Sequence, residues 1–473
     1  MIDTNNIILS TDSYKLNHWM QYPKDTEGVY SYFESRKGSV FPYTTFFGLQ
    51  AIMIDHLEGV VVTEDTIQEA KELSLAHFGN ADYFNEAGWR HILENHGGKL
   101  PVRIKAVPEG MSVPTNNVLM TVENTDPECY WLTNAIESLL THVWYPSTVA
   151  TLSRTTKEGI AAYLDETGCS HDGLGFMLHD FGYRGVTSHE SAGIGGMAHL
   201  VNFLGTDTVP AMQYARKYYD ANLDGLGYSV AATEHSVMTS LGPDGEIGIL
   251  DELIKDYPTG ILSVVSDSYD IYNFVNEVCN RKDAIMERDG VFVVRPDSIT
   301  NEHKTPEELT LWIVETLWNT FGGTVNEAGY RTLDPKVRVL WGDGINQYGI
   351  FAILGYLRDA RHKYAAENMV FGMGGGLLQK MNRDSQRFAF KCSSQKREGM
   401  WHDVWKRPLD LSKASKKGKL SLIEYEGKLI TLENGAVDSR DILETVFENG
   451  EIVKTYTFDE VRANAGLKVP APV

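Results

Sequence analysis

Residues that could bind a phosphorylated sugar follow several short apolar runs in the second half of the chain. The motif RPDS places Arg295 and Asp297 two residues apart, so an extended backbone could point both toward one site. An arginine fork grips phosphate, and a carboxylate binds a sugar hydroxyl or Mg²⁺. The motif GDG places Asp343 between two glycines that let a ligand approach the backbone. Each motif is weak alone, because an isolated Arg–Asp pair is more often a surface salt bridge.

A glycine-rich turn, GMGGGLLQK at 372–380, also follows an apolar run and precedes a helical stretch. Its backbone N–H groups could cradle a phosphate, or it could be a tight packing turn. It is not a P-loop, because Lys380 lies too far from the last glycine. The second cluster, GIGGMA at 193–198, is interpreted as close helix packing, and HESAG at 189–193 lacks the second histidine of a zinc protease.

One histidine stands beside acids in a similar position. EHS contains His235, and SDSYD supplies Asp267 and Asp270 after the next apolar run. A single histidine is usually structural, and only a place at a barrel mouth would favour function. No nucleophile signature such as GxSxG accompanies these clusters. Together they indicate a phosphosugar substrate and leave lyases, isomerases and glycosyl transferases open.

Seven apolar runs must position these residues. Each ends in a polar or glycine-rich cluster, and most precede a helical stretch, as is typical of parallel strands buried on both faces. The runs are 176–179, 200–205, 228–231, 262–265, 291–294, 337–341 and 369–372. The carboxyl ends of such strands meet at the mouth of a (β/α) barrel, where sites are assembled. A doubly wound open sheet would also gather ligands there and remains the alternative.

The remaining segments indicate additional β structure. Residues 101–123 contain two β-rich runs, and 127–167 are interpreted as two amphipathic helices broken around Pro146. Residues 419–457 contain glycine-bearing hairpins that we expect to join the early β segment. We predict an N-terminal α+β region at 1–174 with an accessory β segment and a helical connector, a (β/α) barrel catalytic domain at 175–400, and a C-terminal β-rich segment at 401–473 that joins the accessory domain.

The composition is that of a globular protein with an acidic surface. The 473 residues are 42% apolar and carry a formal net charge of −21, which disfavours nucleic acid and anionic membranes as partners. No signal segment or membrane-length apolar run is evident, so the chain is expected to be cytoplasmic. The four cysteines are widely spaced without a CxxC pair, which favours buried free thiols over a zinc or redox centre.

Read in order, the motifs closely resemble those of nicotinamide phosphoribosyltransferases, within the type II phosphoribosyltransferase family. They are TDSYKLNHW, VYSYFESR, VPEG, ENTDPECYWLTN, HDFGYRG, NFLGTDT, GYSVAATEHS, SVVSDSYDIYN, RPDS, GDG, GGGLLQK and FKCS. The resemblance implies an irregular (β/α) barrel, an accessory β-rich domain built from N- and C-terminal segments, and a homodimer with shared active sites. It also implies transfer of the 5-phosphoribosyl group from phosphoribosyl pyrophosphate to nicotinamide in NAD salvage, giving nicotinamide mononucleotide and pyrophosphate. A nicotinate phosphoribosyltransferase and a non-catalytic binding protein on the same fold are the alternatives.

The resemblance also implies roles for individual residues. Phe181, together with Tyr14 of the partner subunit, would stack on the nicotinamide ring, and Asp207 would accept a hydrogen bond from its carboxamide. Contacts to the phosphoribosyl and pyrophosphate groups, or supporting positive charge, are implied for Arg184, Arg295, Asp297, Gly342, Asp343, Gly374, Gly375, Arg383, Arg36 and Lys391. ATP would phosphorylate His235, oriented by Asp267, and Mg²⁺ would be held near Asp267 and Asp297, directly or through water.

The sequence departs from the family pattern at two positions. Met373 and Ala389 stand where the animal enzymes carry serines. Because two hydroxyl contacts to phosphate are thereby missing, weaker engagement of phosphate or ATP is expected, with nucleotide synthesis retained.

Overall fold

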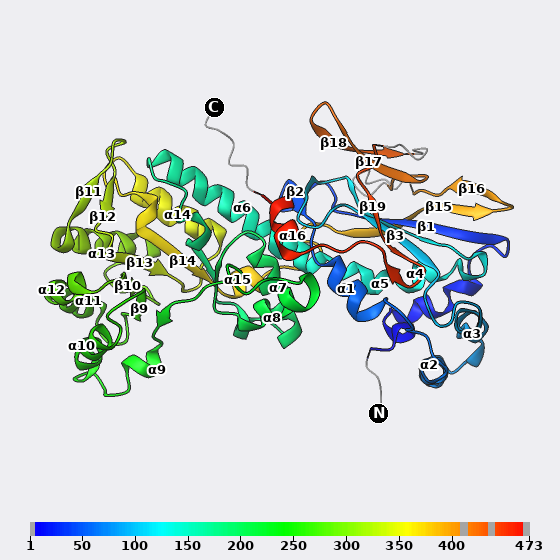
Figure 1. The fold of residues 1–473 in the computed structure, drawn as a ribbon, viewed down its shortest axis with the longest axis horizontal. Helices are drawn as coiled ribbons and strands as arrows, with labels where there is room; N and C mark the ends of the chain where they lie inside the picture. Colours follow the sequence, from blue (N-terminus) through cyan, green and yellow to red (C-terminus); the bar gives the residue numbers. More distant parts are fainter. Residues whose placement is uncertain (1–4, 407–414, 434–439, 467–473) are drawn as a thin grey trace. The chain divides into compact units, whose positions relative to one another are not determined.

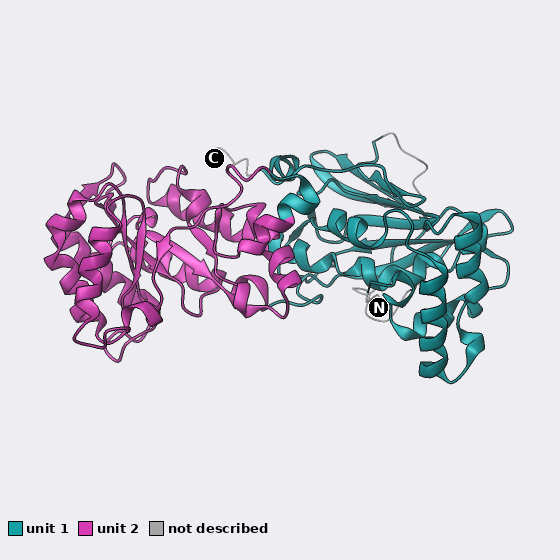
Figure 2. Cartoon of the chain, turned by 60° about the horizontal axis from the view of Figure 1, so that its bottom comes forward, with its two compact units in different colours: residues 1–151, 215–221, 381–466 teal, residues 152–214, 222–380, 467–473 magenta. Residues whose placement is uncertain are grey.

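The computed structural model describes residues 5–406, 415–433 and 440–466. The chain divides into two compact units, drawn in teal and magenta in Figure 2. The first unit comprises residues 1–151, 215–221 and 381–466, and the second comprises 152–214 and 222–380. Among the described residues, no helix has both the length and the apolar character needed to cross a membrane.

A parallel sheet of seven strands forms the centre of the second unit (Figure 1). The order across the sheet is β7-β6-β14-β13-β10-β9-β8. The strands are β6 (Leu178–Asp180), β7 (Gly205–Thr206), β8 (Ala231–Ala232), β9 (Leu262–Val265), β10 (Phe292–Arg295), β13 (Val337–Trp341) and β14 (Met369–Met373). Side chains on both faces of β9 and β14 are mostly buried, which explains why these strands lack polar alternation in the sequence.

The two edges of this sheet curl toward each other. The backbone N–H of Thr206, in edge strand β7, donates to the carbonyl of Tyr228 at 2.9 Å, and the Tyr228 N–H donates to Leu204 at 2.7 Å. Tyr228 leads directly into β8, the opposite edge. The sheet is therefore an irregular, incompletely closed barrel, which confirms the predicted fold class.

Helices and short turns connect the strands of the second unit. They are α6 (Trp144–Glu166) and α8 (Val209–Tyr219), whose residues belong to both units, and η5 (Leu174–Phe176), η6 (Tyr183–Gly185), α7 (His189–Leu200), α9 (His235–Met238), α10 (Glu246–Asp256), α11 (Ile271–Asn280), α12 (Lys282–Glu287), α13 (Pro306–Phe321), α14 (Gln347–Arg358), η7 (Ala366–Asn368), α15 (Gly375–Leu378) and the hairpin β11 (Gly323–Val325)–β12 (Arg331–Leu333). Helix α13 packs against β13 between α11 and α14 (Figure 1). Its start combines a Thr305 cap with Pro306 in the first turn, where a missing N–H costs nothing.

Three local predictions meet different outcomes. GIGGMA lies inside α7, and a Cβ atom on Gly193 would approach the Tyr214 ring to 2.6 Å, so the close-packing interpretation is confirmed. The predicted strand at 200–205 was wrong for most of its length, because α7 ends there and β7 begins only at Gly205. The helix break predicted around Pro146 is confirmed to within a few residues, because α5 (Glu137–Thr141) ends before α6 begins at Trp144, with Pro146 in the first turn, where proline is tolerated.

The first unit contains an antiparallel sheet of seven strands in the order β16-β15-β1-β5-β3-β19-β20. The strands are β1 (Thr26–Glu34), β3 (Val102–Ala106), β5 (Val118–Asn124), β15 (Ala389–Arg397), β16 (Met400–Asp403), β19 (Glu444–Glu448) and β20 (Glu451–Ile452). Strand β1 pairs with β15, and β3 pairs with β19. The expectation that the C-terminal β segment joins the early one is therefore confirmed.

Smaller elements surround this sheet. They are η1 (Ile7–Leu9), η2 (Ser13–Met20), α1 (Leu49–His56), α2 (Glu64–Phe78), η3 (Ala81–Tyr83), α3 (Glu86–Asn95), η4 (Pro127–Cys129), α4 (Leu132–Ala135), α5 (Glu137–Thr141), α16 (Phe458–Asn464) and the pairs β2 (Tyr43–Thr45)–β4 (Ser112–Pro114) and β17 (Leu420–Tyr425)–β18 (Lys428–Glu433). The β17–β18 hairpin matches the glycine-bearing turn predicted from the sequence.

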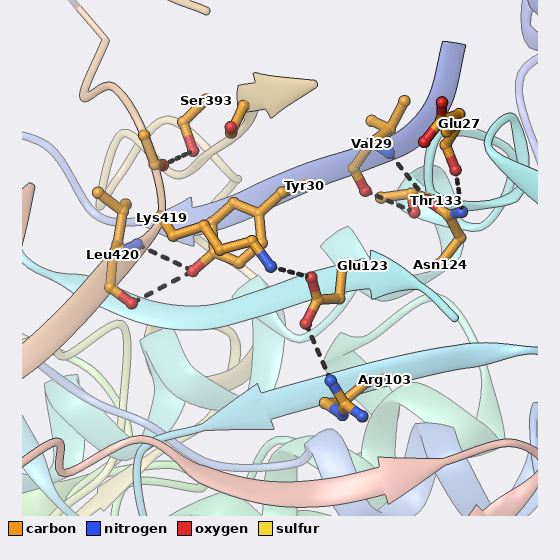
Figure 3. Close-up of polar contacts among 12 residues, drawn as sticks. Glu27, Val29, Tyr30, Arg103, Glu123, Asn124, Thr133, Ser393, Lys419 and Leu420 are labelled. Atoms are coloured by element: carbon orange, nitrogen blue, oxygen red, sulfur yellow. Dashed lines mark hydrogen bonds and ion pairs between the residues drawn. The ribbon is translucent and has the colours of Figure 1, made fainter. Parts of the chain in front are cut away.

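Polar contacts across the antiparallel sheet tie distant segments together (Figure 3). The Tyr30 hydroxyl donates to the Leu420 carbonyl at 3.2 Å and accepts from the Leu420 N–H at 3.0 Å. Burial raises the pKa of Tyr30 to about 12, so the hydroxyl stays protonated and can donate. Glu123 accepts hydrogen bonds from both Lys419 and Arg103 in the same region (Figure 3). The hairpin is thereby fixed to β1 and β5.

Candidate active site

A cavity of about 650 Å³ lies in the second unit at the carboxyl ends of the parallel strands. Its wall contains most of the predicted strand-end residues, because parallel strands end at one edge of the sheet. The lining residues include Phe181, Arg184, Asp207, Thr208, Thr233, Glu234, Val237, Arg295, Asp297, Gly342, Asp343 and Gly374. The RPDS motif, the GDG motif and the glycine-rich turn, which are far apart in the sequence, therefore line one cavity.

Arg295, the last residue of β10, is the principal cation of this wall. Its Nη2 donates to the Thr233 carbonyl at 2.9 Å, which fixes one side of the guanidinium. Its Nε is buried and has no hydrogen-bond partner within the part of the chain that the structure describes. Burial lowers the pKa of this guanidinium, although an arginine stays charged in proteins. A positioned arginine with an unused donor is suited to an anionic ligand.

Two carboxylates, those of Asp267 and Asp297, lie beside His235 in α9, and a third, Asp343, interacts with both of them. The His235 Nε2 lies 3.1 Å from Oδ1 of Asp267, and its Nδ1 lies 3.9 Å from Oδ2 of Asp297. The His235 side chain is 46% exposed, whereas that of Asp267 is 7% exposed, so the acid is fixed and the ring faces solvent. Burial, together with the charges of Asp297 and Asp267, raises the pKa of Asp343. The group can orient an imidazole and attract cations or sugar hydroxyls.

Phe181 follows β6, and its ring lies across the ends of two neighbouring strands. A Cβ atom on Gly372 would lie 2.0 Å from the Phe181 ring, and one on Gly342 would lie 3.4 Å from it. Glycine at 372 is therefore required for the ring to occupy this place. The backbone N–H of Phe181 donates to the Met373 carbonyl at 3.0 Å, which fixes the residue against β14. The result is a flat apolar surface beside the polar cavity.

Asp207 lies where this aromatic surface meets a second, mainly apolar cavity of about 300 Å³. Its Oδ1 accepts a 2.6 Å hydrogen bond from the Ser229 hydroxyl, and its backbone N–H donates to the Asp180 carbonyl at 2.9 Å. Both cavities include Phe181, Asp207 and Arg295 in their walls. A planar ring with a polar substituent could lie on Phe181 and direct that substituent to Asp207.

Comparison with known proteins decides the family. A profile described as the nicotinate phosphoribosyltransferase (NAPRTase) family matches residues 176–451, and one described as the N-terminal domain of nicotinamide phosphoribosyltransferase matches residues 6–104. A nicotinamide phosphoribosyltransferase of Xanthomonas campestris pv. campestris is 45% identical over 98% of both chains. One of Acinetobacter baylyi is 33% identical over 97% of this chain and 96% of its own. The chain belongs to the nicotinamide phosphoribosyltransferase family.

Solved structures show the same fold at low sequence identity. A nicotinate-nucleotide pyrophosphorylase from Pyrococcus furiosus aligns over 98% of this chain and 96% of its own, with a TM-score of 0.61 and 15% identity. Human nicotinic acid phosphoribosyltransferase aligns over 96% of this chain and 92% of its own, with a TM-score of 0.55 and 14% identity. The resemblance read from the motifs is confirmed at the level of the family and the fold.

The glycine turn of this family member lies beside η6, which carries Arg184. Gly374 precedes the four-residue helix α15, and a Cβ atom on Gly374 would approach the Phe181 carbonyl to 3.2 Å. A Cβ atom on Gly185 would lie 3.4 Å from Gly375, whereas the space at Gly375 itself is open. Arg184, Gly374 and Gly375 are thus brought together, with room above the turn.

Four residues to which the family resemblance assigns roles belong to the first unit and are described within it. Tyr14, in η2, is 58% exposed, and its ring contacts that of His18. The Arg36 Nε donates to the Arg387 carbonyl at 2.9 Å, and the Arg383 side chain is exposed beside Asp384. Lys391 donates to the buried carboxylate of Glu34 at 3.2 Å, and burial lowers the pKa of its ammonium group.

Several residues of the two cavities were not predicted from the sequence. Thr233 supplies the carbonyl that holds Arg295, and Ser229 holds Asp207. Arg338 and Tyr228 line the apolar cavity. Arg338 had a detectable signal, because it is the one charged residue in the buried run VRVLW. Ser229 and Thr233 had none beyond their place in GYSVAATEHS.

Proposed function

We propose that this chain transfers the 5-phosphoribosyl group from phosphoribosyl pyrophosphate to nicotinamide, giving nicotinamide mononucleotide and pyrophosphate. The observation that carries the proposal is that one cavity wall contains both the Phe181 ring with Asp207 and the pair Arg295 and Asp297. The first pair suits a planar ring that bears an amide, and the second pair suits a phosphorylated sugar. Membership of the family supports the same reaction.

The reaction needs no nucleophile from the protein. The bond between the anomeric carbon and the pyrophosphate oxygen breaks, and the pyridine nitrogen forms the new bond with its own electron pair. Stacking on Phe181 would hold that nitrogen in line, and Arg295 and Arg184 would stabilise negative charge on the leaving group. Asp343 and Asp297 would bind the ribosyl hydroxyls.

Mg²⁺ fits the carboxylates at this mouth. Asp267 and Asp297 offer oxygen atoms, which this ion prefers, and solvent and phosphate oxygens would complete its shell. When bound, Mg²⁺ would supply positive charge to the pyrophosphate group.

Asp207 would select nicotinamide over nicotinate. The carboxamide N–H can donate to Oδ2, since Oδ1 already accepts from Ser229, whereas a nicotinate carboxylate would meet like charge. Like charges in close contact cost several kcal/mol, so discrimination of at least about a hundredfold is expected.

The test is product formation from each acceptor with phosphoribosyl pyrophosphate and Mg²⁺. The wild type should use nicotinamide, and Asp207→Asn should lose most of its discrimination, while Asp172→Asn, at an exposed position, serves as the control. Preference for nicotinate in the wild type would overturn the specificity. No product from either acceptor would favour the non-catalytic binding protein.

His235 is the proposed acceptor of a phosphoryl group from ATP. With Nε2–H donated to Asp267, the Nδ1 lone pair would attack the γ-phosphorus and ADP would leave. Hydrolysis of the resulting phosphohistidine would then return the free ring and phosphate. His235→Ala should abolish acid-labile labelling from ATP and any stimulation by ATP, while synthesis without ATP continues. Labelling that persists in this variant would contradict the assignment.

A further inference from the structure

A cluster of nitrogen, oxygen and sulfur donors lies in the first unit, at the end of helix α3. His91 lies in the last turns of α3, and His96 is its C-terminal cap. Asp126 caps the N-terminus of η4, and Cys129 is the last residue of that turn. We propose that His91, His96, Asp126 and Cys129 bind one divalent metal ion such as Zn²⁺. This site is separate from the strand-end cavity, and the proposal does not depend on the proposed phosphoribosyl transfer.

The geometry converges on one point. The Nε2 atoms of His91 and His96 lie 2.8 Å and 2.6 Å from the same atom, Oδ2 of Asp126. One ligand atom from each of the four residues lies within 4.8 Å of all the others. Adjacent ligands of a tetrahedral zinc ion are about 3.3–3.6 Å apart, given metal–ligand distances of about 2.0–2.3 Å. Shifts of less than about 1 Å in each ligand would therefore create the site.

The donor types select the metal. Two imidazole nitrogens, one carboxylate and one thiolate form a set that zinc accepts in tetrahedral geometry, whereas Mg²⁺ prefers oxygen ligands in octahedral geometry. The Mg²⁺ of the proposed reaction is therefore a poor occupant. Within residues 5–406, 415–433 and 440–466, no other group of His, Cys, Asp and Glu residues meets this spacing.

The Asp126 carboxyl and the Cys129 thiol differ in protonation state before a metal binds. Burial raises the pKa of Asp126, but hydrogen bonds from His91 and His96 outweigh it and hold the pKa at about 2, so the carboxylate is ionised. Burial raises the pKa of the Cys129 thiol. Metal binding would form the metal–sulfur bond and release the thiol proton to solvent. The two histidines must bind through Nε2 as neutral rings.

The surroundings hold the ligands in place. The Asp126 Oδ1 accepts from the Glu128 N–H at 3.0 Å, which leaves Oδ2 for the cluster. The Asn124 side chain donates to the Asp126 carbonyl at 2.8 Å and accepts from the Val29 N–H at 2.8 Å, so the turn is anchored to β1 (Figure 3). The Asn95 side-chain amide nitrogen lies 3.1 Å from Nδ1 of His91 and donates to the His91 carbonyl at 3.3 Å, so it holds this histidine in place.

Access and enclosure also suit an ion. The side chains of His91 and His96 are 29% and 28% exposed, whereas Cys129 is fully buried. The ring of Trp89, in α3, packs edge to face on that of Trp131, two residues after η4, with centroids 4.7 Å apart. An ion could enter past the histidines, and the aromatic pair fixes the distance between α3 and η4. Binding would join these two elements and stabilise the first unit.

The sequence pattern gave only a partial signal. His91 and His96 form H-x₄-H, and Asp126 and Cys129 form D-x₂-C, but about thirty residues separate the two pairs. Asp126 and Cys129 belong to the motif ENTDPECYWLTN, whereas neither histidine lies in a motif that carries the family resemblance. The motifs that carry the family resemblance therefore do not contain the complete set of donors.

The experiment uses the full-length protein after chelation and titrates it with Zn²⁺ alone, by calorimetry and by thermal unfolding. One equivalent should bind with a dissociation constant of about 1 μM or lower and should raise Tm. Co²⁺ should give a thiolate-to-metal absorption band, because Cys129 is a ligand. Excess Mg²⁺ should not displace either ion.

Two variants make the assignment specific. His91→Gln/His96→Gln should weaken Zn²⁺ binding at least about a hundredfold and abolish the Zn²⁺-dependent rise in Tm. Cys129→Ser should remove the thiolate band. The control is His171→Gln, which breaks another His–Asp pair, 2.9 Å long, that no third candidate ligand joins among the described residues. Phosphoribosyl transfer by each variant would show that it has folded.

A wild type that binds no Zn²⁺, or a double-histidine variant that binds it equally well, would overturn the proposal. These outcomes leave the proposed reaction untouched, because the histidine cluster and the strand-end cavity share no residue.

Discussion

The hydroxyl of Ser229 donates a 2.6 Å hydrogen bond to Oδ1 of Asp207, so the loop that enters β8 holds an acid that follows β7. These two strands are the edges of the curled parallel sheet. The hydrogen bond that orients the acid therefore also links the two edges of the sheet.

Ser229→Ala should weaken selection of nicotinamide. The Asp207 carboxylate would lose its fixed orientation, and a hydrogen bond to a charged group at an exposed position contributes about 1 kcal/mol, or roughly fivefold. We expect kcat/KM for nicotinamide to fall by about that factor, mainly through KM. Ser170→Ala, at an exposed position elsewhere in the unit, is the control. An unchanged KM would show that Asp207 needs no support from Ser229.

Gly372→Ala should displace the ring of Phe181. The added methyl group would lie 2.0 Å from that ring, so the ring must leave the strand end. We expect kcat/KM for nicotinamide to fall more than about tenfold, with a loss of about 1–3 kcal/mol of stability from overpacking. The control is Gly248→Ala in α10, where a Cβ atom meets nothing within 4 Å and helix propensity improves by up to about 1 kcal/mol. Full activity in the first variant would contradict the proposed stacking surface.

A shared site in a homodimer makes a quantitative prediction for mixed variants. Tyr14→Ala and Phe181→Ala should each be nearly inactive if Tyr14 of the partner subunit completes the site. When the two variants are unfolded and refolded together, half of the dimers should contain one intact site, so activity should recover to about a quarter of the wild type. Recovery of none would place both side chains in one chain's own site, and sedimentation would report the dimer directly.

The buried histidine His199 should make the second unit sensitive to acid. Burial lowers its pKa to about 3, and its Nδ1 faces the Ser153 hydroxyl at 2.8 Å. An unfolded histidine titrates near pH 6.5, so the stability that depends on the neutral ring is complete above that pH and is lost as the pH falls toward 3. At pH 5 the loss should be about 2 kcal/mol.

His199→Gln should remove that dependence. Urea unfolding of the wild type should show a lower midpoint at pH 5 than at pH 7.5, and the variant should show a smaller difference, although its stability at pH 7.5 is reduced. An equal fall in both proteins would assign the acid sensitivity to other groups.

The sequence predicted the parallel strands best where both faces of a strand are buried. The runs at 262–265 and 337–341 coincide with β9 and β13, because a short unbroken apolar run between turn residues fits few other structures. The strand predicted at 200–205 was wrong because a short apolar run can also be buried at the end of a helix. Its apolar residues Leu200, Val201 and Phe203 are buried at the end of a helix, and periodicity cannot distinguish the two over six residues.

The candidate site was predictable where a residue directly follows its strand. Arg295, Asp297 and Asp343 lie in one cavity because chain order alone places them at strand ends. Ser229 and Thr233 act through residues on other strands, and that pairing depends on strand order in the sheet, which the sequence does not state. The roles of all these residues remain predictions.

The discontinuity of the first unit has a consequence for the nascent chain. Strands β1 and β3 are made early, but their partners β15 and β19 follow β14, the last strand of the parallel sheet. On the ribosome, one edge of β1 and one edge of β3 must therefore stay unpaired while the whole second unit is synthesised. A released fragment ending at Lys380 should resist protease within 222–373 and remain cleavable within 26–124, and protection of 26–124 in that fragment would contradict this order. The part of the protein that is translated first is thus expected to be the part that finishes folding last.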